Sequence, residues 1–434
     1  MLFAVCNISP YIFSFRKSLR FTKAHPPFWP LNIRAPATQF VNHSCCRLFL
    51  SRHLTAIFTV SLLLWMLDNG HQITDIRLKT MSDSKTVEAY TTPMADDDPT
   101  AAQRKRDHIE LAFRSQIAQG ELDQRFYYEP LLAPHPQRGS LKHQLFLGKT
   151  LRAPLWVSSM TGGTDWAHTI NHNLARACRD FGMGMGLGSC RALLGSDETL
   201  PDFDVRAIIG DELPLFANLG IAQLEHIVER GRYNLVRELL AKLQADGLII
   251  HVNPLQEWLQ PEGDRFAKAP IETISTLLER LDVPMIVKEV GQGMGYHSLK
   301  ALFQLPLAAV DFAANGGTNF AKLELLRSDE MKRDIYSRLA NVGHSAAEMV
   351  LITNQLVVEL GERMLCKQVI ISGGIQHFLD GYYLINTLQL NAVYVQASGF
   401  LKHARGDYQE LYDYVDAQVQ GLELANALLR VKGV

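Results

Sequence analysis

The segment HVNPLQE, residues 251–257, brings an imidazole, two amides and a carboxylate together within one short stretch. The apolar run before it predicts a strand, and strand alternation places His251 and Asn253 on the same side. Pro254 would end the strand and start a loop that presents Gln256 and Glu257. A carboxylate oxygen suits a hard cation such as Mg²⁺. Glu257 is therefore a candidate metal ligand, and an exposed loop carboxylate is the plainer alternative.

Two pairs of glycines lie late in the chain, Gly316–Gly317 before Thr318 and Gly373–Gly374 before Ile375. Glycine lets a backbone approach a ligand closely, and free N–H groups at the start of a following helix favour phosphate. Each pair alone would also suit an ordinary turn. Together they indicate a site for a phosphorylated cofactor.

A third feature is the basic run RKRDH, residues 104–108, ahead of a predicted helix over 109–119. It concentrates cations that could hold an anionic ligand. By itself, such a run is more often a solvated surface. Its meaning therefore depends on the elements around it.

Apolar runs of strand length alternate with amphipathic helical patterns through the last two thirds of the chain. The eight predicted strands are 153–159, 182–188, 215–219, 248–252, 284–290, 308–314, 369–372 and 392–397, and the clearest helices are 169–180, 233–245, 271–281 and 346–360. Most strands are apolar on both faces, as in a parallel sheet covered by helices. We therefore predict an α/β fold, a (β/α)8 TIM barrel. An open doubly wound sheet is the alternative, but no early GxGxxG turn follows the first strand.

Nearly every predicted strand ends in glycines and polar residues, such as SSMTGG, GLGS, ANLG, KEVG and SGGI. In TIM barrels the active site is assembled at the C-terminal ends of the strands. Ordinary turn chemistry explains one or two such ends, but not eight. The pattern predicts one functional rim.

Charge is divided unevenly. Residues 1–80 hold nine Lys/Arg and two acids, about +7, and the rest hold 34 basic and 43 acidic residues, about −9. An acidic body argues against a nucleic-acid binder. The six cysteines include no CxxC pair, so neither a disulfide framework nor a zinc site is indicated. We expect a reduced, cytoplasmic protein.

The first eighty residues differ in kind from the rest, being basic and aromatic, with the fourteen-residue apolar run Leu54–Leu67. A membrane-spanning helix needs about 20 residues, and a signal peptide would lie earlier. The run is a membrane anchor, a targeting segment, or the product of an upstream start. We favour the last, with Met81 opening the native or ordered chain. The predicted domains are an extension over 1–80, a segment with the basic helix over 81–150, and the barrel over 151–434.

From about Arg104 to Ser398 the chain resembles the type 2, FMN-dependent isopentenyl-diphosphate isomerases. The matching motifs are RKRDH, SSMTGG, MGLGSCR, ANLG, HVNPLQE, VKEVGQG and GGT. HVNPLQE together with RKxxH is specific to this family, whereas MTGG or SGGI alone would fit many flavin barrels.

The resemblance implies a role for each matched position. Residues that would hold FMN are Ser159, Met160, Thr161, Ser189, Asn218, Lys288 and Thr318, with Gly373, Gly374, Ile375, Gln396 and Ala397 at its phosphate. Residues that would contact substrate are Arg104, Lys105, His108, Ser189, Cys190, Arg191, His251, Asn253 and Gln256. Gln256 and His251 would be catalytic, Gln256 as a positioning amide, and Glu257 would bind Mg²⁺. For Lys288, a buried ion pair with Glu289 or another acid is the alternative.

The chain departs from the family at three places near the phosphate. Asn315 stands where a glycine is usual before GGT, Gln376 stands where an arginine usually follows SGGI, and the last strand ends in Gln396–Ala397 rather than an Ala-Arg-like pair. These changes bear on phosphate contacts rather than on the fold, because backbone N–H groups can do the same work.

The implied reaction interconverts isopentenyl and dimethylallyl diphosphate by a 1,3-allylic proton shift, in isoprenoid biosynthesis, with reduced FMN as acid and base. The resemblance also implies NADPH as reductant, Mg²⁺ on the diphosphate, a homotetramer or homo-octamer, and no nucleic acid or stable membrane association. Two rivals stay open: an FMN-dependent 2-hydroxy-acid oxidase, which needs a His where Asn315 stands, and a membrane-tethered, non-catalytic barrel.

Overall fold

The computed structural model describes residues 100–159, 161–162 and 166–433. The predictions made for residues 1–80, including the apolar run and the start at Met81, lie outside this range. The chain divides into two compact units between Asp107 and His108, and each is described by itself. Helix α2 (Ala101–Leu111) crosses this division and contains the whole basic run. The predicted helix over 109–119 was therefore wrong in its bounds, because the favourable helix formers Ala, Gln, Arg and Lys start it at Ala101.

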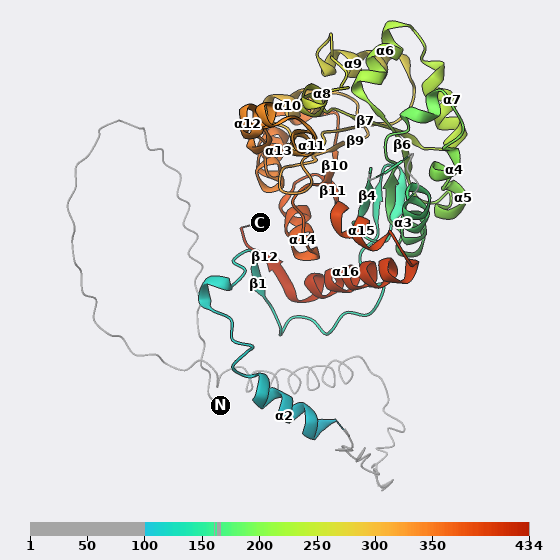
Figure 1. Cartoon of the computed structure of the whole chain (residues 1–434). Coiled ribbons are helices and arrows are strands. Elements are labelled where there is room, and N and C mark those ends of the chain that lie inside the picture. The colour runs from blue at the N-terminus through green and yellow to red at the C-terminus, as the bar shows by residue number, and fades with distance from the viewer. Residues whose placement is uncertain (1–99, 160, 163–165, 434) are drawn as a thin grey trace, which may run out of the picture. The chain divides into compact units, whose positions relative to one another are not determined.

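Within the described residues, eight parallel strands form one sheet in the order β11-β10-β9-β8-β7-β6-β5-β4 (Figure 1). The strands are β4 (Trp156–Ser158), β5 (Gly184–Gly186), β6 (Leu215–Gly220), β7 (Gly247–His251), β8 (Met285–Lys288), β9 (Ala309–Asp311), β10 (Gln368–Ile371) and β11 (Asn391–Tyr394). A parallel bridge between Leu155 and Tyr394 joins the two edges, and the Tyr394 N–H donates to Pro154 O at 3.0 Å. The TIM barrel is confirmed, and all eight strands coincide with predicted ones.

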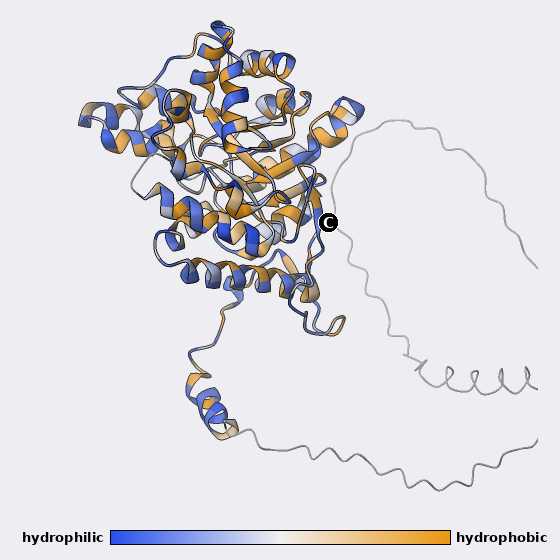
Figure 2. Cartoon of the chain, turned by 90° about the vertical axis from the view of Figure 1, so that its right-hand side faces the viewer, coloured by the Kyte–Doolittle hydropathy of each residue, from blue (hydrophilic) through white to orange (hydrophobic). Residues whose placement is uncertain are grey.

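The strands are short and almost wholly buried, which explains their apolar composition. Each residue of β4, β5, β6 and β9 is buried, and in Figure 2 the strands and the inner faces of the helices are mostly hydrophobic. Strand β5 is glycine-rich because a Cβ at Gly184 would come 2.2 Å from the Trp156 ring. That ring also packs edge-on against Phe146 and Phe216, with centroids 6.2 and 6.1 Å away.

Helices surround the sheet (Figure 1). After α2 they are α3 (Ala167–Phe181), α4 (Leu200–Phe203), α5 (Arg206–Ile209), α6 (Ile221–Glu229), α7 (Asn234–Leu243), α8 (Pro254–Leu259), α9 (Pro270–Arg280), α10 (Tyr296–Phe303), α11 (Phe320–Arg327), α12 (Glu330–Tyr336), α13 (Ala346–Leu360), α14 (Phe378–Thr387), α15 (Ala397–His403) and α16 (Tyr408–Leu428). Short 3₁₀ turns are η1 (Gln119–Glu121), η2 (Arg191–Leu194), η3 (Ser337–Asn341) and η4 (Gly361–Arg363). The four predicted helices correspond to α3, α7, α9 and α13. Within the described part of the chain, no helix is both long and apolar enough to cross a membrane.

Two antiparallel pairs were not predicted. Strand β1 (Phe126–Tyr128) pairs with β12 (Leu429–Val431), and β2 (Gln144–Phe146) pairs with β3 (Lys149–Leu151). Three-residue strands are too short to show a period, and the partners of β1 lie at the other end of the chain. Phe146 and Leu151 are fully buried in the barrel core, so the second pair belongs to the scaffold.

Candidate active site

A cavity of about 330 Å³ opens at the C-terminal ends of the strands, as predicted. It is lined by Ser159, Thr161, Gly162, Gly188, Ser189, Asn218, His251, Gln256, Lys288, Val290 and Phe320. These residues come from five successive strands and their loops, and from α8 and α11. Parallel strands place their carboxyl ends on one rim, which brings seven of the predicted site residues around one space.

His251 and Asn218 form a pair across neighbouring strands β7 and β6, in which Asn218 is buried and His251 is half-buried. The Asn218 amide donates to Leu187 O at 3.0 Å, so its Oδ1 is left to accept. His251 Nδ1 lies 2.9 Å from Asn218 Oδ1. Nδ1 therefore carries the proton, and Nε2 is the acceptor. Burial lowers the pKa of His251 to about 4, and the positive charge of Lys288 lowers it further. The imidazole is neutral at physiological pH.

Gly220 makes room for this pair. A Cβ at Gly220 would come 2.8 Å from His251 Nε2 and 2.3 Å from Gln223 Oε1. Any larger residue at the end of β6 would push the imidazole out of place. The ANLG motif is therefore partly a packing requirement of His251.

The residues after β7 form helix α8 rather than the loop that was predicted. Proline is well suited to the first turn of a helix, and Pro254 begins this one. Asn253 precedes it and donates to Gln256 Oε1 at 3.1 Å and to Glu257 Oε1 at 2.9 Å. The other side-chain atom of Asn253, Oδ1, is buried without a partner.

Glu324 is a buried carboxylate next to the candidate site that was not predicted from the sequence. It lies on α11, is 3% exposed, and its Oε1 is 3.5 Å from Gln256 Nε2. Arg327 stabilises the carboxylate by donating to Glu324 Oε2 at 2.6 Å. In sequence it is one acid within an amphipathic helix, and the Glu-x-x-Arg spacing is the only local signal.

Lys288 ends β8 at the cavity wall, and the ion pair with Glu289 that was the alternative to its flavin role does not form. Lys288 Nζ donates to the backbone carbonyl of Glu289 at 2.8 Å. The Glu289 carboxylate instead accepts from the N–H groups of Gly291, Gln292 and Gly293. Burial raises the pKa of Glu289, and those three N–H donors and Lys288 oppose the rise.

Asp311 lies beside Lys288 in the strand register and is fully buried. It accepts from Ser158 Oγ at 3.0 Å and from Ser372 Oγ, which links β9 to the strand ends of β4 and β10. Burial raises the pKa of Asp311, and the charge of Lys288 acts against that rise. This carboxylate was not singled out because it lies within an apolar strand.

The two glycine loops contact one another. A Cβ at Gly316 would come 3.0 Å from the Cα of Gly374, and Gly316, Gly373 and Gly374 all have positive φ, at 116°, 93° and 73°. A residue with a side chain would be strained at each of these positions. Thr318 is exposed beside them and Ile375 is buried. Asn315 Oδ1 accepts from the Gly316 N–H at 2.8 Å, so this departure from the family supports the loop itself.

Gln396 and Ala397 follow β11, where α15 begins. Gln396 is 1% exposed; its Oε1 accepts from the Tyr414 hydroxyl at 2.8 Å, and its Nε2 is buried without a partner. A buried, unpartnered amide donor beside a glycine-rich rim is an orphan that a bound anion would satisfy. Gln376 is exposed, and its backbone N–H donates to Asp380.

The remaining predicted substrate residues lie either after β5 or on helix α2. Cys190 is buried, its thiol donates to Gly188 O at 3.3 Å, and burial raises the pKa of the thiol to about 12. Arg191 is exposed on the rim with Nη1 3.3 Å from Asp264 Oδ2. Arg104, Lys105 and His108 lie on α2, where the chain divides into its two units, so their approach to the cavity stays a prediction. Met160 lies outside the described residues.

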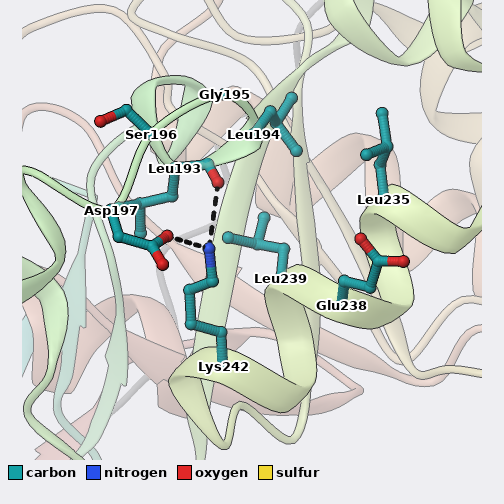
Figure 3. Close-up of a pocket in the computed structure, with 9 residues that line it drawn as sticks. All are labelled: Leu193, Leu194, Gly195, Ser196, Asp197, Leu235, Glu238, Leu239 and Lys242. Carbon is teal, nitrogen blue, oxygen red and sulfur yellow. Dashed lines mark hydrogen bonds and ion pairs between the residues drawn. The ribbon is translucent and has the colours of Figure 1, made fainter.

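A second cavity of about 300 Å³ lies between η2 and α7 and shares no lining residue with the first (Figure 3). Lys242 reaches across it to the Asp197 carboxylate and to Leu193 O. None of the predicted site residues lines it.

No family model matches the chain. Similar proteins include three named isopentenyl-diphosphate delta-isomerase. That of a Synechococcus strain is 37% identical over 64% of this chain and 78% of its own length. Those of Rickettsia felis and a Synechocystis strain are 33% and 34% identical over 74% of this chain and 91% and 90% of their own lengths.

Among solved structures, a mandelate oxidase variant with a monooxide FMN adduct is 13% identical, with a TM-score of 0.44 over 71% of this chain and 88% of its own. At that level the likeness adds nothing to the assignment. The sequence identities, which span most of the length of the relatives, are sufficient: the chain belongs to the isopentenyl-diphosphate delta-isomerase family.

Proposed function

We propose that this chain is the type 2, FMN-dependent form of the isomerase and interconverts isopentenyl and dimethylallyl diphosphate by a 1,3-allylic proton shift. One observation carries the proposal. Lys288, the neutral His251–Asn218 pair and Gln256 line a single cavity at the C-terminal ends of the strands, and the contacting glycine loops follow β9 and β10 at the same ends. A flavin ring needs a cation and hydrogen-bonding side chains around it, and its phosphate needs a backbone that it can approach closely.

The residues present fit FMN. Ser159 Oγ is buried without a partner at the cavity wall, and Gln396 Nε2 is a second buried donor without one. Ser159, Thr161, Ser189, Asn218 and Lys288 would hold the ring, and Thr318, the two glycine loops and the Gln396–Ala397 corner would hold the phosphate. Reduced FMN, with NADPH as the proposed reductant, supplies proton-transfer chemistry at ring nitrogen N5 when bound.

The donor set at α8 fits Mg²⁺ on a diphosphate. Asn253 Oδ1 is a buried oxygen without a partner, and the Glu257 carboxylate is close enough to accept from the same amide, at 2.9 Å. Magnesium prefers oxygen ligands, and phosphate oxygens and water complete its shell. Glu257 would bind the metal, and Arg191 would contact the diphosphate from the neighbouring loop.

The chain's own contribution near the alkene is positioning and proton control. His251 is held neutral and offers Nε2 as an acceptor. The Gln256 amide oxygen is held by Asn253, which turns its NH₂ group toward Glu324. An amide does not titrate usefully, so Gln256 orients the substrate, and Glu324, which is paired with Arg327, holds the Gln256 NH₂ group in place. Rate would come mainly from orientation and electrostatics.

The 2-hydroxy-acid oxidase alternative gains no support from the site. That chemistry needs a histidine before the paired glycines, where this chain has Asn315, whose Oδ1 is used by the Gly316 N–H. The membrane-tethered alternative depends on Leu54–Leu67, which lies outside the described residues.

The test is isomerisation of isopentenyl diphosphate by the purified full-length protein with FMN, NADPH and Mg²⁺, each omitted in turn. We expect a yellow protein that converts the substrate only when all three are supplied. Lactate and glycolate serve as control substrates, and no oxidation of either is expected. A colourless protein after incubation with excess FMN, or isomerisation that continues without flavin, would contradict the proposal.

A further inference from the structure

Asp264 contacts three different segments of the active-site rim. It lies just after α8, and its Oδ2 is 3.3 Å from Arg191 Nη1, on the loop after β5. The same oxygen accepts from Gln223 Nε2, on α6, at 3.0 Å. Its backbone N–H donates to Glu257 Oε2 at 2.8 Å. One residue thereby bridges the segments that follow β5, β6 and β7.

The contact with Arg191 matters because that side chain is otherwise poorly restrained. The Arg191 side chain is 63% exposed, whereas that of Asp264 is 27% exposed. A free arginine samples many rotamers, and ordering it on binding costs affinity. Gln223 prevents the carboxylate from turning away, so Asp264 is the more fixed member of the pair.

The contact with Glu257 uses a different part of the residue. The backbone N–H of Asp264 and the side chain of Asn253 each hold one oxygen of the Glu257 carboxylate. Glu257 lies on helix α8 after β7 and Arg191 lies in the 3₁₀ turn η2 after β5, so no short stretch of chain fixes one side chain relative to the other. Asp264 fixes their relative position, because its side chain holds Arg191 and its backbone N–H holds Glu257.

We propose that Asp264 is a positioning residue for diphosphate binding, which aims Arg191 and Glu257 at the same diphosphate. This inference rests on the proposed function, in which Arg191 contacts the diphosphate and Glu257 binds its metal. Asp264 itself contacts neither substrate nor cofactor.

Asp264→Asn separates the two contacts, because it keeps the backbone N–H and the side-chain volume but removes the charge that holds Arg191. The probe is inorganic pyrophosphate with Mg²⁺, titrated calorimetrically into the FMN-loaded full-length protein. A partly exposed ion pair contributes about 1 kcal/mol or less, so we expect binding about fivefold weaker. The KM for isopentenyl diphosphate should rise by a similar factor, with kcat within about twofold.

A double-mutant cycle with Arg191→Gln decides whether Asp264 acts through Arg191. In the Arg191→Gln background, Asp264→Asn should no longer weaken pyrophosphate binding. Equal weakening in both backgrounds, or unchanged or tighter binding by Asp264→Asn alone, overturns the inference and leaves the proposed function intact. If Arg191→Gln binds pyrophosphate as tightly as the wild type, both the inference and the proposed role of Arg191 are wrong.

Asp197→Asn is the matched control. Asp197 pairs with Lys242 across the second cavity, between η2 and α7 (Figure 3). The substitution therefore removes an ion pair from the segment that carries Arg191 and leaves the contacts of Asp264 unchanged. Pyrophosphate affinity should stay at the wild-type value. A loss equal to that of Asp264→Asn would mean that the loop has merely loosened, and would overturn the positioning role. Retained FMN absorbance in every variant confirms that the barrel is folded.

Discussion

The opposite ends of the barrel use the same kinds of polar residue in different ways. At the N-terminal ends of the strands, the Asp246 carboxylate accepts from Arg206 at 2.9 Å, from Lys149 at 2.6 Å and from the Leu215 N–H at 2.8 Å. Arg206 is 4% exposed and also donates to three backbone carbonyls. At the C-terminal ends, Ser159 Oγ and Asn253 Oδ1 are buried without partners.

The difference separates a scaffold from a binding site. Leaving a buried polar group unpaired costs about 1–3 kcal/mol, and the Asp246 carboxylate avoids that cost because both of its oxygens are paired. At the C-terminal ends, Ser159 Oγ and Asn253 Oδ1 stay unpaired at positions where a bound ligand can supply the missing partner. Breaking a contact at one end should therefore cost stability, and breaking one at the other should cost activity.

The largest effect is expected at the N-terminal end. Arg206→Met removes the best-buried partner of Asp246 and takes a donor from three backbone carbonyls, of which Leu213 O keeps Lys149 Nζ as a second donor at 3.2 Å. The free energy of unfolding should fall by about 3 kcal/mol, measured by urea denaturation, while kcat per folded molecule is unchanged. Lys149→Met, which removes a more exposed partner, is the milder control. Lost turnover in a protein of normal stability would break the comparison.

Gln256→Ala tests the opposite end. It removes an amide that lies between Asn253 and Glu324 on the cavity wall, so turnover should fall by about a hundredfold through lost orientation. The FMN dissociation constant and the unfolding midpoint should stay near wild type. Gln260→Ala, at the end of the same helix, controls for changes in α8 itself. Wild-type turnover by Gln256→Ala would remove this residue from the site.

A smaller effect is expected from His251, which is half-buried at the C-terminal end of β7. Its pKa is lowered from 6.5 to about 4, so the folded state resists a proton that the unfolded state accepts. Its contribution to stability is complete above pH 6.5 and is lost as the pH falls toward 4. We expect the free energy of unfolding of the FMN-free protein to drop by about 2 kcal/mol over that window.

The control for that measurement is His251→Asn, which lacks the titrating group. Its unfolding free energy should change less steeply with pH over the same window. Equal slopes in the two proteins would mean that His251 titrates normally and is not enclosed as the structure has it.

The strands and the rim could be predicted because their signals are local. Apolar runs bounded by glycines and polar residues marked all eight strands, and parallel connectivity then sent every strand end to one side. The α8 helix was mistaken for a loop although Pro254 is a recognised helix start, because the HVNPLQE segment was interpreted through its chemistry. Helix α2 was misplaced because its charged first half carries no apolar period.

Glu324 and Asp264 show the limit of such reasoning. Glu324 meets Gln256 from 68 residues away, and Asp264 meets Arg191 from 73 residues away. Near Asp264 nothing in the sequence distinguishes it from a solvated acid, and the Glu-x-x-Arg spacing at Glu324 is equally common on exposed helices.

The amino-acid sequence by itself determined which residue types lie at the strand ends and that those ends share a rim, because periodicity and turn residues act over a few neighbours. Only the tertiary structure decided which atoms meet: the proton on His251 Nδ1 facing Asn218, the Gln256 amide turned toward Glu324, and Lys288 bonded to a carbonyl rather than to the Glu289 carboxylate. Hydrogen bonds depend on tenths of an ångström between separate strands, and that spacing is set by the packing of the whole barrel.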